Sequence, residues 1–115
     1  MSFVDGYVLA CPEDAKQAYI EMAQKVGAML KACGALQVTE CWSNDVPRGK
    51  VTDFYMATQA KDGEAIVFSW VVWPDKDTRN AGWGKLMEDP EMRANKPPFD
   101  GQRMFWGGFD VIFEA

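Results

Sequence analysis

AIVFSWVVW, residues 65–73, is almost wholly apolar, and this stretch decides the fold. Successive side chains of a strand point to opposite faces of the sheet. One face here would carry Val67, Val71 and Trp73, while the other would carry Phe68 and Trp70. A strand that is apolar on both faces is typical of the centre of a sheet that is covered on both sides. We therefore expect residues 65–73 to be a central strand.

The sequence on either side predicts further strands. Three stretches are rich in aromatic and β-branched residues: 3–10, 36–43 and 104–113. The first and last of these again carry apolar side chains on both faces. Similar residues predict an additional strand at 51–60, which would join the central strand through a hairpin turn at Asp62-Gly63.

Two helices are expected between the strands. Apolar residues recur every three or four positions from Ala15 to Cys33, and Gly34 would end this helix. A second helix is predicted to begin at 74–77. Its inward residues would be Ala81, Leu86 and Met87. Asp89-Pro90 interrupts this helix, and residues 91–94 would add another turn.

The order of these elements is β-α-β-(β)-β-α-β, which predicts a single ferredoxin-like domain over residues 1–115. This is an α+β fold with an antiparallel sheet, and both helices cover the same face. The other face would then expose several large apolar side chains, each at a cost of about 1.5–3 kcal/mol relative to burial. A second copy of the sheet is the simplest cover. We therefore expect a homodimer whose sheets pack face to face as a dimeric α/β barrel.

Composition limits the classes of partner. The 115 residues include 17 acidic and 12 basic side chains and no histidine, which gives a net charge of −5. This balance argues against binding to nucleic acid or to an anionic membrane surface. The sequence shows neither a signal peptide nor an apolar run of about 18 residues, so we expect no membrane span. The three cysteines have no CxxC spacing, and we expect a reducing, cytoplasmic location.

Three stretches carry a family resemblance: SFVDGY at 2–7, the segment from Glu40-Cys41-Trp42 to VTDF at 51–54, and PFDGQRM at 98–104 followed by GGF at 107–109. In these stretches the chain resembles the YbaA-like proteins, a bacterial family of unknown function. The resemblance implies membership of the dimeric α/β-barrel group, which also includes cofactor-free monooxygenases and haem-degrading enzymes. It therefore implies a fold and leaves the chemistry open.

Three residues are candidates for catalysis: Glu40, Asp53 and Arg103. Glu40 shares a strand face with apolar side chains, and such surroundings raise a carboxyl pKa toward values useful for acid–base chemistry. The alternative for Glu40 is pairing with Arg103 or Lys50, or exposure on an edge strand. Arg103 would hold a carboxylate ligand or, alternatively, tie Asp100 or Glu40 across the fold.

Residues that would contact a ligand form a second set: Trp42, Asp45, Lys50, Trp70 and Arg103. The loop 44–53 would gate an apolar pocket between the sheet and the helices. For the loop charges the alternative is simple solvation, and for the tryptophans it is core or dimer packing. Cys11 precedes the first helix and is either a small buried residue or a reactive thiol.

No metal site or cofactor is expected. Histidine is absent, and no carboxylate pair has the spacing of metal ligands on a helix. A haem would lack its usual axial histidine. The leading hypothesis is therefore a small-molecule-binding protein with a mostly apolar pocket. The alternatives are a cofactor-independent enzyme, such as an oxygenase or isomerase, and a structural or regulatory dimer without a ligand.

Overall fold

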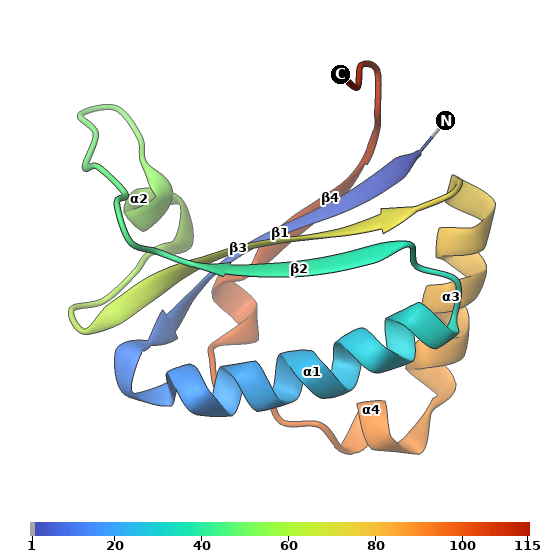
Figure 1. The fold of residues 1–115 in the computed structure, drawn as a ribbon. Helices are drawn as coiled ribbons and strands as arrows, with labels where there is room; N and C mark the ends of the chain where they lie inside the picture. Colours follow the sequence, from blue (N-terminus) through green and yellow to red (C-terminus); the bar gives the residue numbers. More distant parts are fainter. Residues whose placement is uncertain (1) are drawn as a thin grey trace.

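A computed structural model describes residues 2–115 and contains a four-stranded antiparallel sheet (Figure 1). The strands are β1 (Phe3–Pro12), β2 (Gln37–Trp42), β3 (Glu64–Trp73) and β4 (Phe105–Asp110). Their order across the sheet is β2-β3-β1-β4. The expectation that the first strand and the 65–73 strand are central is confirmed.

Helices lie on both sides of this sheet, but not equally. They are α1 (Lys16–Ala32), α2 (Phe54–Thr58), α3 (Lys76–Glu88) and α4 (Pro90–Ala94), with short 3₁₀ turns at Glu13–Ala15 and Gly101–Arg103. Figure 1 shows the long α1 crossing one face with α4 beside it, whereas the short α2 lies on the opposite face. We call the face covered by α1 and α4 the helix face, and the face that carries α2 the open face.

Strand alternation places the core between the sheet and the long helices. On β1 the side chains of Phe3, Leu9 and Cys11 are buried on the helix face. Their partners on β3 are Trp73, Val67 and Ala65, which are buried on the same face. The two central strands therefore form the floor of the core.

The first helix ends where the sequence predicts. Cys33 closes the last turn, and Gly34 follows with a positive φ of 108°. Such a left-handed conformation favours glycine because it has no Cβ. The turn delivers the chain directly to β2 at the edge of the sheet.

The second helix also begins as expected, because the side chain of Asp75 accepts a hydrogen bond from the backbone N–H of Thr78 at 2.7 Å. Its predicted inward face is partly wrong. Leu86 is buried, but Met87 is 55% exposed and Ala81 is also exposed. The residues that face the sheet are Arg79, Gly82, Trp83 and Leu86, which follow the helical spacing. Because Arg79 is charged, a pattern based on apolar residues alone does not reveal this face.

The strand predicted at 51–60 is wrong, because residues 54–58 form α2. The Asp53 carboxylate caps the start of this helix by accepting a hydrogen bond from the N–H of Met56 at 2.6 Å. It also accepts one from the N–H of Gly49 in the preceding loop, at 2.8 Å. Gln59 ends it in the left-handed conformation. The Asp62-Gly63 turn is present, but it joins a helix to β3 instead of closing a hairpin.

The open face is only partly covered. Under α2, Thr58, Ile66 and Ala10 are buried, and Phe54 meets Phe68 edge to face at 6.2 Å. Beyond α2 the face exposes large aromatic side chains: Phe68 (46% exposed), Phe105 (45%) and Phe109 (63%). Their register against Val8 and Val4 of β1 places all three on the same face. The expected two-faced apolar sheet is therefore present in the chain.

The last strand is shorter than the predicted 104–113 and ends at Asp110. It approaches the helix face closely at Gly108. A Cβ at this position would lie 2.6 Å from the ring of Phe3 and 2.7 Å from Nη2 of Arg79. Glycine therefore lets β4 lie beside the core without displacing the Phe3 or Arg79 side chain.

Candidate functional site

Two adjacent cavities lie between the sheet and the long helices. The arginine-side cavity has a volume of about 400 Å³ and is lined by Arg79, Asn80, Met87 and Trp106 together with four shared residues. The glutamate-side cavity has a volume of about 280 Å³ and includes Glu40, Tyr19, Ser69 and Phe99. Both are lined by the same four side chains: Tyr7, Trp83, Met92 and Met104. The shared wall makes them neighbouring parts of one site.

A buried ion pair fixes the arginine-side cavity. The side chain of Asp5 is fully buried, and its carboxylate accepts hydrogen bonds from Nε of Arg79 at 3.0 Å and from Nη2 at 2.7 Å. The indole N–H groups of Trp73 and Trp83 donate to the same carboxylate at 3.1 and 3.3 Å. Four donors therefore satisfy the buried charge, as a buried carboxylate requires. These hydrogen bonds raise the pKa of Arg79, which remains charged.

Aromatic rings form the wall beside this pair. Tyr7 lies 6.4 Å from Trp83 and 6.3 Å from Trp106, measured between ring centroids. Arg79 also lies over the Trp106 ring, 5.6 Å from its centroid. Burial raises the pKa of the Tyr7 hydroxyl, and the nearby Asp5 charge adds to this effect. The Tyr7 hydroxyl therefore stays protonated at neutral pH, and it can act as a hydrogen-bond donor in the wall that the two cavities share.

The glutamate-side cavity is organised by a carboxylate and a tyrosine. Glu40 comes from β2 and Tyr19 from α1, and the Tyr19 hydroxyl donates to Oε1 of Glu40 at 2.7 Å. Desolvation by the surrounding protein raises the pKa of Glu40, although hydrogen bonds from Tyr19 and Ser69 act in the opposite direction. The pKa of Tyr19 is raised by burial and by Glu40, so this hydroxyl remains a donor.

Glu40 is also accessible from outside. It lines an open groove between α1 and β2, whose walls include Ala23, Gly27, Leu36 and Val38. The same carboxylate lines the internal cavity, so it lies where the groove and the cavity meet. This position explains how Glu40 keeps solvent contact while neighbouring protein atoms still raise its pKa.

The other predicted site residues lie elsewhere. Trp42 packs against Tyr19 at 6.2 Å and lies under the Lys16 ammonium, whereas Trp70 packs against Phe68 on the open face. Neither tryptophan lines the two cavities. Their roles in ligand binding stay predictions.

The loop 44–53 does not border the cavities either. Asp45 lines a small cleft together with Phe54 and Phe68 toward the open face, and Lys50 is exposed. Asp53 caps α2, and its two backbone hydrogen bonds lower its pKa. The segment beside the glutamate-side cavity is instead 92–104, which contributes Met92, Asn95, Pro97, Phe99, Gly101 and Met104. The loop 44–53 therefore does not lie beside the two cavities, where it was expected to act as a gate.

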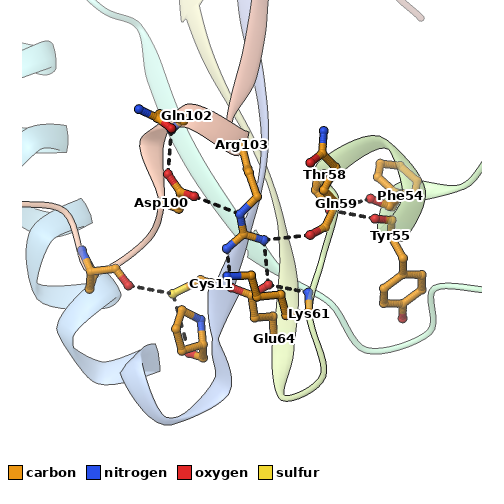
Figure 2. A network of polar contacts seen from close by, with 12 residues as sticks. Cys11, Phe54, Tyr55, Thr58, Gln59, Lys61, Glu64, Asp100, Gln102 and Arg103 are labelled. Carbon is orange, nitrogen blue, oxygen red and sulfur yellow. Dashed lines mark hydrogen bonds and ion pairs between the residues drawn. The ribbon is translucent and has the colours of Figure 1, made fainter.

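Arg103 belongs to a separate polar network (Figure 2). Its two terminal nitrogens donate to the Glu64 carboxylate at 2.8 and 2.7 Å, and its Nε donates to Asp100 at 3.1 Å. Nη1 also donates to the carbonyl of Gln59 at 3.0 Å. These contacts lower the pKa of Glu64 to about 2, chiefly through the hydrogen bonds from Arg103. The predicted tie to Asp100 is confirmed, whereas the alternative tie to Glu40 does not form.

Cys11 lies beside this network without being activated by it. It is fully buried, with Sγ 3.8 Å from the carbonyl of Pro98, and burial raises its pKa. A thiol with a raised pKa is a poor nucleophile. The structure therefore favours the interpretation of Cys11 as a small buried residue.

Sequence reasoning missed three residues that shape the site: Tyr7, Tyr19 and Arg79. One signal was available, because Asp5 stands on the apolar face of a central strand and a buried carboxylate needs donors. The sequence alone could not show that three of the four donors come from a helix more than seventy residues later.

Two further features are absent from residues 2–115. Within that range no group of three or more His, Cys, Asp or Glu residues is placed to hold a metal ion. No helix in the described part of the chain has the length and apolar character needed to cross a membrane.

Comparison with known proteins agrees with this architecture. A crystal structure titled as a dimeric ferredoxin-like protein from an uncultured marine organism superimposes with a TM-score of 0.61, at 12% identity, covering 99% of this chain and 98% of the other. The chain is 50% identical to "Uncharacterized protein YbaA" of Escherichia coli K12 and of Shigella flexneri, and each alignment covers 99% of both proteins. Residues 2–101 match the family described as "Protein of unknown function (DUF1428)". The resemblance to YbaA-like proteins is thus confirmed, and the chain belongs to the DUF1428 family, with a ferredoxin-like α+β fold.

Proposed function

We propose that this protein binds a small, mostly apolar molecule in the two adjacent cavities between the sheet and the helices. The observation that carries the proposal is their lining, in which aromatic and methionine side chains surround a few fixed polar groups. Ligand sites generally have this composition, with volumes of roughly 300–1,000 Å³. Methionines add adaptable apolar surface at such sites.

The polar groups are positioned before any ligand arrives. Asp5 fixes Arg79 through its hydrogen bonds, so the guanidinium is held at the cavity wall. Tyr7 remains a hydrogen-bond donor in the shared wall, and the Tyr19–Glu40 pair lies at the other end. Groups that are already ordered lose little entropy on binding, which favours recognition.

A thermal-shift screen with a metabolite library tests this proposal. Met92→Trp would place a larger side chain in the shared wall and fill space in both cavities. We expect it to abolish the thermal shifts that library members give with the unmodified protein. Ala94→Trp places the same side chain on an exposed position of α4 outside both cavities, so it should preserve the shifts. A screen without stabilising compounds, or with hits equally affected by both variants, would contradict cavity binding.

We also propose that the working unit is a homodimer in which two open faces pack together as a barrel. Support comes from the exposed Phe68, Phe105 and Phe109, since contiguous apolar surface of this kind marks protein interfaces. The solved neighbour of the same fold is titled as dimeric. A cytoplasmic location is kept as a prediction, supported by three free cysteines.

Light scattering after size exclusion tests the dimer. Phe109→Glu should shift the protein toward the monomer by placing a charge in the interface. Met87→Glu is the matched control, because it charges an exposed apolar position that belongs to the helix side. An unmodified protein that is monomeric at micromolar concentration would contradict the proposal.

A second candidate function is cofactor-independent catalysis. It is favoured by one observation, the raised pKa of Glu40 at a cavity that also contains a protonated tyrosine. In an isomerase-like reaction the Glu40 carboxylate would take a proton from a carbon acid, and Tyr7 would donate to the developing oxyanion. Deuterium exchange from D₂O into a ligand found by the screen, lost in Glu40→Gln, would establish this function. Binding without deuterium exchange would support ligand binding and contradict catalysis.

A further inference from the structure

Glu40, at an exposed position of the edge strand β2, differs from Asp5 and Glu64 in having no arginine partner among residues 2–115. Among residues 2–115 no lysine or arginine nitrogen lies within 4 Å of its carboxylate. It is also the single charged residue that lines the glutamate-side cavity in the described part of the chain. Its contacts are neutral hydroxyl donors, of which Tyr19 lies at 2.7 Å.

The nearby cations are committed to other groups. Lys31 lines the groove between α1 and β2, but its ammonium donates to the carbonyl of Leu36 at 2.9 Å. The Lys16 ammonium lies over the Trp42 ring at 5.6 Å. Arg79 is bonded to Asp5 at the other cavity. The protein therefore leaves the Glu40 carboxylate without a positive charge of its own.

Four aromatic side chains line the same cavity as this unpaired carboxylate. Tyr19 and Phe99 form one pair of rings, with centroids 5.8 Å apart, and Tyr7 and Trp83 form another at 6.4 Å. All four side chains line the glutamate-side cavity. Aromatic faces attract cations, and cages of such rings are a common means of recognising organic ammonium groups. A carboxylate on the same cavity wall adds a charge-assisted hydrogen bond.

We propose that the glutamate-side cavity binds a small organic amine, whose ammonium group pairs with Glu40 and whose apolar body lies among the aromatic rings. This inference rests on the proposed ligand-binding function and specifies the chemistry of the ligand. The amine would enter through the groove between α1 and β2, because Glu40 lines both spaces. The small residues Ala23 and Gly27 line this groove, and Glu40 is exposed.

Two probes of similar shape test the charge directly. The first is 2-phenylethylamine and the second is the neutral 2-phenylethanol, with binding followed by tryptophan fluorescence and titration calorimetry. We expect the amine to bind at least tenfold more tightly than the alcohol. Glu40→Gln should remove this preference, because it keeps the size of the side chain and the acceptor for Tyr19 but removes the charge.

Control variants separate the local charge from other effects. Glu21→Gln makes the same change on the exposed side of α1, away from the cavity, and should keep the preference. Tyr19→Phe keeps both the carboxylate and the ring, so it should also retain the preference for the amine. Loss of the preference in Glu21→Gln would show a general charge effect and would overturn the inference.

The remaining outcomes distinguish this inference from the proposed function. If the alcohol binds as tightly as the amine, or if Glu40→Gln leaves the preference unchanged, the amine assignment is overturned while cavity binding stands. If neither probe binds at millimolar concentration but the library screen finds neutral ligands, the same conclusion holds. If the library screen also finds nothing, both proposals fail.

Discussion

Glu64 and Glu40 lie on neighbouring strands of the same sheet, yet the protein treats their charges in opposite ways. Glu64 receives two hydrogen bonds from Arg103, and its pKa falls to about 2. Glu40 accepts hydrogen bonds from hydroxyl groups and has no cationic partner, and desolvation raises its pKa. Asp5, with Arg79 and two tryptophans, resembles Glu64 in being matched within the chain. Matched carboxylates hold segments together, whereas the unmatched carboxylate lies where a ligand can reach it.

The largest effect is expected where a matched charge is most deeply buried. Arg79→Met leaves the fully buried Asp5 carboxylate without its partner and should lower the free energy of unfolding by about 3–5 kcal/mol. Urea denaturation at fixed protein concentration measures this. Adding Asp5→Asn to Arg79→Met should recover part of the loss, because the uncompensated charge is removed. A loss below about 1 kcal/mol would show that Asp5 is not a charge matched by Arg79.

An intermediate effect is expected at the Arg103 network. Arg103→Met should destabilise the protein near pH 7, by less than Arg79→Met does, because Glu64 loses charge-assisted hydrogen bonds. The pKa of Glu64 is lower in the folded state than its ordinary value of 4.5. This contribution is therefore full above pH 4.5 and is lost as the pH falls toward 2.

The difference between the unmodified protein and Arg103→Met should accordingly shrink on acidification. Urea titrations at pH 7, 4 and 3 measure this change. Lys85→Met, at an exposed position of α3, controls for the general effect of removing a positive charge. A difference that stays constant with pH would assign the role of Arg103 to packing alone.

The smallest effect, with the opposite sign, is expected at Glu40. Its folded pKa is raised, so the ionised carboxylate opposes folding above that pKa and the cost disappears below the ordinary value of 4.5. Glu40→Gln should therefore stabilise the protein at pH 7 by roughly a few tenths of a kcal/mol, since solvent in the groove screens the charge. At pH 3 the two proteins should be equally stable. Destabilisation at pH 7 would mean that Glu40 is matched after all.

The central part of the fold could be predicted from the sequence because its signals are local. Residues 65–73 are apolar on both faces, and this property alone places the strand at the centre of the sheet. Gly34 marks the end of α1 because a positive φ favours glycine. The segment 51–60 is the exception, since its β-branched residues predict a strand whereas the Asp53 cap starts a helix.

The site was less accessible to such reasoning. Glu40 could be singled out because a carboxylate among apolar residues on one strand face is visible in the sequence. Its surroundings could not, because Tyr7, Tyr19 and Trp83 are brought together from β1, α1 and α3 by tertiary packing. The Arg103 partner was also non-local, since Glu64 lies 39 residues earlier in the chain.

The close approach at Gly108 has a practical consequence for engineering. A methyl group there would meet both the Phe3 ring and the Arg79 guanidinium, and the latter borders the arginine-side cavity. Gly108→Ala would therefore require the Phe3 ring or the Arg79 guanidinium to shift, and a shift of the guanidinium would alter the cavity while every lining side chain keeps its identity. A substitution at position 108 is thus a way to change the shape of the arginine-side cavity from the edge of the sheet.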